Sequence, residues 1–72
     1  MKAQVGDSVR LVAEVLSEVS KAVLAAGSEG TVIEAYANPE LYAVDVEVPA
    51  PELVGGVRFH NVLLSPSQFE RI

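Results

Sequence analysis

The chain has 72 residues and no cysteine, so its core must form without a disulfide or a thiolate-bound metal. This length predicts a single domain over residues 1–72, because two separate cores would each bury too little surface to be stable. Ten acidic residues against five basic ones give a net charge of −5. The five basic residues are scattered along the chain, which argues against nucleic acid or an anionic membrane as a partner.

Hydrophobic residues make up 50% of the chain, which is generous for so small a domain. No apolar run approaches 18 residues, and the N-terminus lacks the pattern of a secretory signal, so we expect a cytoplasmic protein. A core of this size cannot bury every apolar side chain. We therefore expect another protein, or a second copy of the chain, to cover an apolar surface patch.

The first third of the chain supports two interpretations. From Val9 to Val15, apolar and polar residues alternate, which predicts a strand. This is the favoured interpretation, but over a longer window apolar residues also recur at helical spacing, namely Val12, Val15, Leu16, Val19, Val23 and Leu24. The segment is therefore either a strand followed by a long loop, or a helix from about Ser8 to Ala25 capped by Gly27.

The middle of the chain predicts an antiparallel hairpin. The residues from Thr31 to Tyr36 favour a strand, and we expect Gly27 and Gly30 before it to need positive φ. A second strand, LYAVDVEV, begins at Leu41 and alternates regularly. Only a few residues around Asn38-Pro39 connect the two strands, which is too short for a crossover helix.

The last third predicts a loop, a strand and a short terminal strand. PAPELVGG carries two prolines and two glycines, as expected of a loop. The strand VRFHNVLL changes the phase of its apolar residues, which predicts a bulge near His60-Asn61. SPSQFERI then predicts a proline-started turn and a short strand that carries Phe69 and Ile72.

Five short strands joined mostly by short connections favour a small, strongly bent barrel. The segments VGDSVRL, AGSEGTVIEAY, LYAVDV and LLSPSQFE, in this order, resemble the SH3-like barrels of bacteria. The chain is most similar to a family of small standalone bacterial domains of unknown function that carry a G-T-V-V-E motif. It also resembles, more weakly, the SH3-like barrel of the nitrile hydratase β subunit and its accessory proteins.

This resemblance covers nearly the whole chain and implies an all-β fold, a five-stranded SH3-like barrel with a long first loop. The segment from Leu16 to Ala26 departs from the family, because it is longer and more apolar than that family's first loop, and it has room for a helical turn. A full helix from Ser8 to Ala25 would instead give an α+β fold.

Residues that could carry chemistry are few. His60 is the only histidine, and it can be combined on paper with Ser65 or Ser67 and Asp45 as a triad. No G-x-S-x-G turn accompanies them, and serine beside proline is ordinary in turns. We therefore predict no catalytic residue, no cofactor and no metal site.

Binding is the expected activity. The candidate partner-binding residues are Leu16, Val19, Val23 and Leu24 of the first loop, together with Tyr36, whereas Tyr42, Phe59 and Phe69 are expected in the core. The sequence favours a non-catalytic module that binds protein, by self-association or as a small subunit of a larger complex. The alternative, implied by the second resemblance, is an accessory subunit or activator of a metalloenzyme similar to nitrile hydratase.

Overall fold

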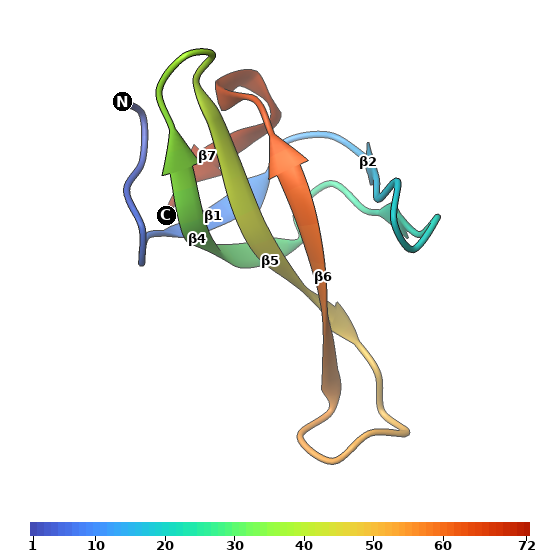
Figure 1. Cartoon of the computed structure of the whole chain (residues 1–72). Coiled ribbons are helices and arrows are strands. Elements are labelled where there is room, and N and C mark those ends of the chain that lie inside the picture. Colours follow the sequence, from blue (N-terminus) through green and yellow to red (C-terminus); the bar gives the residue numbers. More distant parts are fainter.

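A computed structural model describes residues 1–72 and shows a protein built of strands (Figure 1). The strands are β1 (Ser8–Leu11), β2 (Val15–Leu16), β3 (Val23–Leu24), β4 (Glu29–Tyr36), β5 (Leu41–Pro49), β6 (Val57–Leu64) and β7 (Phe69–Arg71). One turn of 3₁₀ helix, η1 (Pro66–Gln68), precedes β7. The structure has no helix of the length and apolarity that crossing a bilayer requires.

Five strands form one antiparallel sheet in the order β6-β5-β4-β1-β7. The remaining two, β2 and β3, pair only with each other and form a short hairpin beside the sheet (Figure 1). β6 and β7 lie at the two edges, and no pairing joins them. The all-β fold class is confirmed, as is the number of strands predicted for the sheet.

The alternative of a helix from Ser8 to Ala25 is wrong, and so is the α+β fold that it implied. A helix would have buried the stripe that contains Val12, Val19 and Val23, yet all three side chains are exposed. The buried residues of this segment are Val9, Leu11, Val15, Ser17 and Leu24. Burial thus follows the pairing of short strands rather than the period of a helix.

The core lies on one face of the sheet, and the β2–β3 hairpin contributes Val15 and Leu24 to it. On β5, Tyr42, Val44 and Val46 are fully buried, as their regular alternation predicts. The core cluster consists of Ala3, Val9, Leu11, Val15, Leu24, Val32, Tyr42, Val44, Val46, Val62, Leu64 and Phe69. Tyr42 and Phe69 meet edge to face, with ring centroids 5.2 Å apart, so two of the three aromatic rings predicted for the core pack together there.

Phe59 does not belong to this core, contrary to the prediction. It lies on the opposite face of β6 and is 58% exposed. Its strand pairs with β5 in one continuous register, so Val62 and Leu64 point inward and Phe59 points outward with Leu63. The predicted bulge at His60-Asn61 is therefore absent. The sheet has a bulge in β4 instead, where the register with β5 shifts between Val32 and Glu34.

The two glycines that were predicted to need positive φ, Gly27 before β4 and Gly30 within it, serve different purposes. Gly27 has φ +89°, as predicted for the turn that enters the strand, and its amide donates to the Leu11 carbonyl. Gly30 has no positive φ, so that prediction is wrong for it. A Cβ at Gly30 would lie 2.5 Å from the Asp45 carbonyl oxygen, so this glycine permits the close approach of β4 and β5.

The N-terminal residues close one end of the core through a polar network. The Lys2 amide donates to the Tyr42 hydroxyl (2.8 Å) and to Glu40 Oε2 (2.9 Å), and the Tyr42 hydroxyl donates to the same carboxylate. The hydrogen bond from Tyr42, followed by that from the Lys2 amide, lowers the pKa of Glu40. Burial, followed by the hydrogen bond to Glu40, raises the pKa of Tyr42.

Candidate functional site

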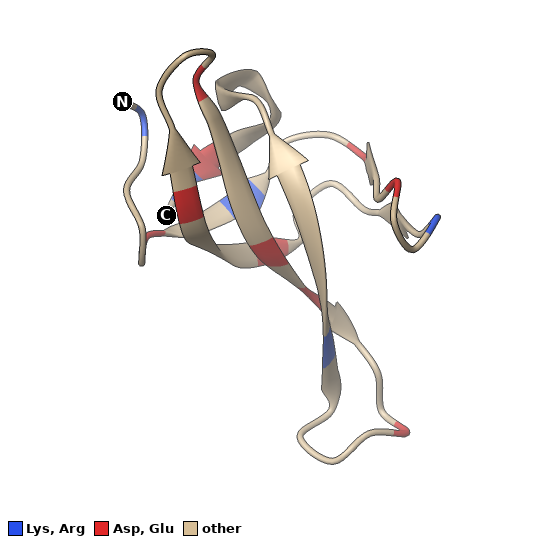
Figure 2. Cartoon of the chain, in the orientation of Figure 1, with Lys and Arg blue, Asp and Glu red and all other residues tan.

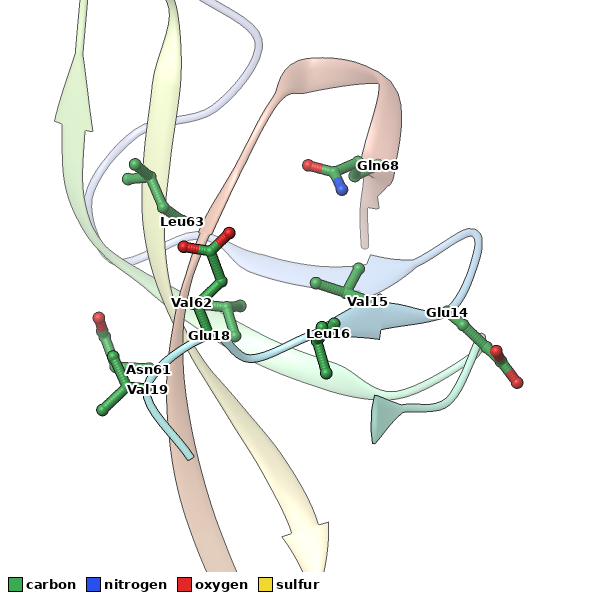
Figure 3. A pocket seen from close by; sticks show the side chains of 9 residues that line it. All are labelled: Glu14, Val15, Leu16, Glu18, Val19, Asn61, Val62, Leu63 and Gln68. Atoms are coloured by element: carbon green, nitrogen blue, oxygen red, sulfur yellow. The ribbon is translucent and has the colours of Figure 1, made fainter. Parts of the chain in front are cut away.

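The larger surface groove, about 460 Å³ in volume, lies between the β2 segment and the edge strand β6. Figure 3 shows the nine side chains that line it: Glu14, Val15, Leu16, Glu18, Val19, Asn61, Val62, Leu63 and Gln68. They come from the loop around β2 and from β6 and η1, which lie about 40 residues or more further along the chain. The groove therefore exists only in the folded chain.

The β2–β3 hairpin sets one wall of this groove. Val15 pairs with Leu24, and both point into the core, whereas Leu16 pairs with Val23, and both point outward. Beyond Leu16 the chain turns at Lys21, whose φ is +61° and whose amide donates to the Ser17 carbonyl. This turn leaves Val19 91% exposed at the mouth of the groove.

The tip of the hairpin loop contacts β6 through one polar pair. Ser20 Oγ lies 3.0 Å from His60 Nδ1, at the surface. This contact spans 40 residues of sequence and holds the two walls of the groove near each other. His60 therefore has a structural partner in the loop.

The charge of the groove is acidic. Its lining includes Glu14 and Glu18 but no lysine, arginine or histidine. Figure 2 shows acidic residues on the loop around β2, with a basic residue at the tip of the loop. An apolar groove edged by carboxylates favours a ligand that carries both apolar and basic groups.

A second, shallower groove of about 330 Å³ lies on the outer face of the sheet. Tyr36, Asn38, Pro39, Leu41 and Leu63 line it, so Leu63 belongs to both grooves. The Tyr36 hydroxyl donates to Glu34 Oε2 at 2.8 Å, and this hydrogen bond raises the pKa of Tyr36.

The predicted partner-binding residues do not all lie together. Leu16 and Val19 line the larger groove, and Tyr36 lines the smaller one. Val23 is exposed but lines neither groove. Leu24 is buried at 2% exposure, so its placement on the binding surface is corrected: it points inward to pack with Val15 and fills the core.

Sequence reasoning missed Asn61 and Leu63 as groove residues. In VRFHNVLL both the odd and the even positions include apolar residues, so the sequence alone does not show which face of the strand points inward. The signal lies in the neighbouring strand: once β5 is aligned, Val62 falls opposite Val44, and Leu63 must point outward.

The groups considered for catalysis are dispersed. Ser65 Oγ contacts Ser67 and Gln68 in the capping of η1, while Asp45 accepts a hydrogen bond from Asn61 Nδ2. Neither serine bonds to His60, whose hydroxyl partner is Ser20. No three side chains of histidine, aspartate or glutamate lie close enough together to hold a metal ion.

Comparison with known proteins found no protein-family model, no curated protein and no solved structure that matches this chain.

Proposed function

We propose that this chain is a non-catalytic protein-binding module whose binding site is the groove between the β2 segment and β6. The observation that carries the proposal is the exposure of Leu16, Val19 and Leu63 around one concave surface. These side chains are 57%, 91% and 57% exposed. Apolar side chains that line a groove together at the surface are typical of an interaction site.

We also infer that the sheet and the hairpin together form an SH3-like barrel. The order of elements supports this inference: a first strand, a hairpin loop, three antiparallel strands, one turn of 3₁₀ helix and a short last strand that returns to β1. In this interpretation the β2–β3 hairpin is the long first loop, and the whole chain is one domain.

The ligand that fits the groove is an extended segment with alternating apolar and basic residues. Alternation suits the site because one face of an extended segment can contact the apolar wall while the other carries charge. Basic side chains would meet Glu14 and Glu18, and no cation of the groove would oppose them.

The test is an NMR titration of dilute ¹⁵N-labelled protein with a synthetic peptide of alternating valine and lysine. Shift changes should concentrate on the amides of Leu16, Val19, Asn61 and Leu63. The matched control peptide has glutamate in place of lysine, and it should bind more weakly because the groove is acidic.

A Val19→Asp variant completes the design. Since Val19 is 91% exposed, the substitution should leave the fold intact and reduce binding of the valine-lysine peptide. Shift changes scattered over the surface, or equal binding of the two peptides, would contradict the proposed site.

A further inference from the structure

The edge strand β6 has an unpaired row of backbone groups along the groove. The Ala50 amide donates to the carbonyl of Gly56, the residue directly opposite it. In a regular antiparallel ladder every second pair of opposite residues is hydrogen-bonded, so the register fixes which residues of β6 bond to β5. Arg58, His60 and Val62 therefore bond to β5 through their backbone. The amides and carbonyls that point away from the sheet belong to Val57, Phe59, Asn61 and Leu63. None of these backbone groups has a backbone hydrogen-bond partner.

Apart from the β2–β3 loop, which contacts β6 through Ser20 and His60, this edge lacks the features that usually protect one. β6 runs for eight residues in a continuous register without a bulge, and it contains neither proline nor lysine. Its only permanently charged residue is Arg58. The opposite edge of the sheet is the three-residue strand β7, which offers far less backbone to a partner.

We propose that the occupant of this edge is a second copy of the chain, paired antiparallel through β6 about a twofold axis at Asn61. This inference rests on the proposed protein-binding function of the groove and names its partner. In this register Asn61 of one copy lies opposite Asn61 of the other. Phe59 then lies opposite Leu63 of the second copy, and this pair occurs twice.

Apolar complementarity favours this register. Phe59 and Leu63 are both on the outer face of β6 and are 58% and 57% exposed in the single chain. Directly opposed aromatic and aliphatic residues stabilise a pair of antiparallel strands. A shift by two residues would instead place two His60 side chains opposite each other and pair Phe59 with Asn61.

Charge complementarity favours a second copy over an unrelated acidic protein. Each chain has a net charge of −5, but β6 contains no acidic residue and carries Arg58. In the paired strands, Arg58 of one copy falls opposite Leu64 of the other. It is therefore next to Val62 of that second copy, which lines the groove together with the carboxylates of Glu14 and Glu18. Arg58 within its own chain has only a 3.8 Å, solvent-exposed contact with Glu52 to give up.

The test is sedimentation equilibrium over a range of concentrations on wild type and five variants. Wild type should show a monomer–dimer equilibrium. Phe59→Lys and Asn61→Pro should each weaken dimerisation by about tenfold or more. Proline at Asn61 removes only an amide that points away from β5, which edge strands tolerate, and Phe59→Lys covers the case in which the proline disturbs folding.

Three further variants supply a control and a charge exchange. Val54→Lys makes the same kind of change on the fully exposed loop between β5 and β6 and should leave dimerisation unchanged. Arg58→Glu should weaken the dimer, and adding Glu18→Arg should restore it, because the swap exchanges the two charges across the interface. A merely structural role of Arg58 would not be rescued in this way.

The outcomes separate the two proposals. A wild type that is monomeric at every concentration, yet binds the valine-lysine peptide in the groove, overturns β6 pairing and leaves the proposed function standing. A monomer that binds no peptide overturns both. A dimer that is insensitive to Phe59→Lys and Asn61→Pro uses another surface and also overturns this inference.

Discussion

Replacing Leu24 with alanine tests how the β2–β3 hairpin is attached to the sheet. Leu24 is 2% exposed and belongs to the core, whereas Leu16, in the other strand of the same hairpin, is 57% exposed. Leu24→Ala removes three buried carbon atoms at about 0.8 kcal/mol each, and the cavity left behind adds to that loss. We expect a loss of about 3 kcal/mol in the free energy of unfolding.

This is a large share of the total stability, since 72 residues correspond to an unfolding free energy of about 4–11 kcal/mol. It should lower Tm by about 12 °C or more. The control Leu16→Ala removes the same atoms from an exposed position and should change stability by less than about 0.5 kcal/mol.

Urea denaturation followed by circular dichroism measures both variants. Equal losses for Leu24→Ala and Leu16→Ala would refute the packing described here, because the two side chains would then have similar surroundings. A near-neutral Leu24→Ala would show that the hairpin does not rest on the core.

Three further predictions concern close packing and the polar network at the N-terminal end. Gly30→Ala should cost about 1–3 kcal/mol in urea denaturation, because the new Cβ would lie 2.5 Å from the Asp45 carbonyl oxygen; an unchanged stability would contradict the close approach of β4 and β5. The pKa of Glu40 is lower in the folded chain than its ordinary value of 4.5, so the ionised carboxylate stabilises the fold above that pH. This stabilisation is lost as the pH falls through the folded pKa, and the urea midpoint of unfolding, measured at a series of acid pH values, tests it. Tyr42→Phe should destabilise the chain and flatten that acid dependence, since it removes the hydroxyl that bonds Glu40 and the Lys2 amide; an unaltered acid limb would be inconsistent with this network.

The strands whose apolar residues all fall on one face were predictable from the sequence. In β5 the alternation of Tyr42, Val44 and Val46 with polar residues settles both the strand and its buried face. The terminal turn and strand with Phe69 were predictable as well, because Pro66 starts a turn and cannot continue a ladder. In each case local chemistry alone selects the structure.

Where a strand has apolar residues on both faces, its buried face was not predictable from the sequence. Leu16 and Leu24 are equally hydrophobic, and only the hairpin register, Val15 opposite Leu24, decides that one is exposed and the other buried. The same holds for Phe59 and Leu63, whose outward orientation is set by the pairing of β6 with β5. Tertiary pairing is the missing information, and it also determines the groove.

The bulge shows the same limitation. In β4 the consecutive apolar residues Val32 and Ile33 hide the change of phase, so the sequence gives no sign of the register shift there. The change of phase in VRFHNVLL is visible, yet β6 is regular, because its solvent face simply carries apolar residues. An apolar residue on a strand is thus a poor indicator of the buried face when the outer face is itself an interaction surface.

Residue-resolved amide hydrogen exchange on β6 tests the central claim most directly, namely that the edge beside the groove is a binding site. In dilute samples, the amides of Arg58, His60 and Val62 should exchange slowly, and those of Phe59, Asn61 and Leu63 should exchange fast. At high concentration or with the valine-lysine peptide, the second group should become protected, because a partner strand accepts their hydrogen bonds. If Phe59, Asn61 and Leu63 stay unprotected under both conditions, no strand pairs with β6, and the account is contradicted.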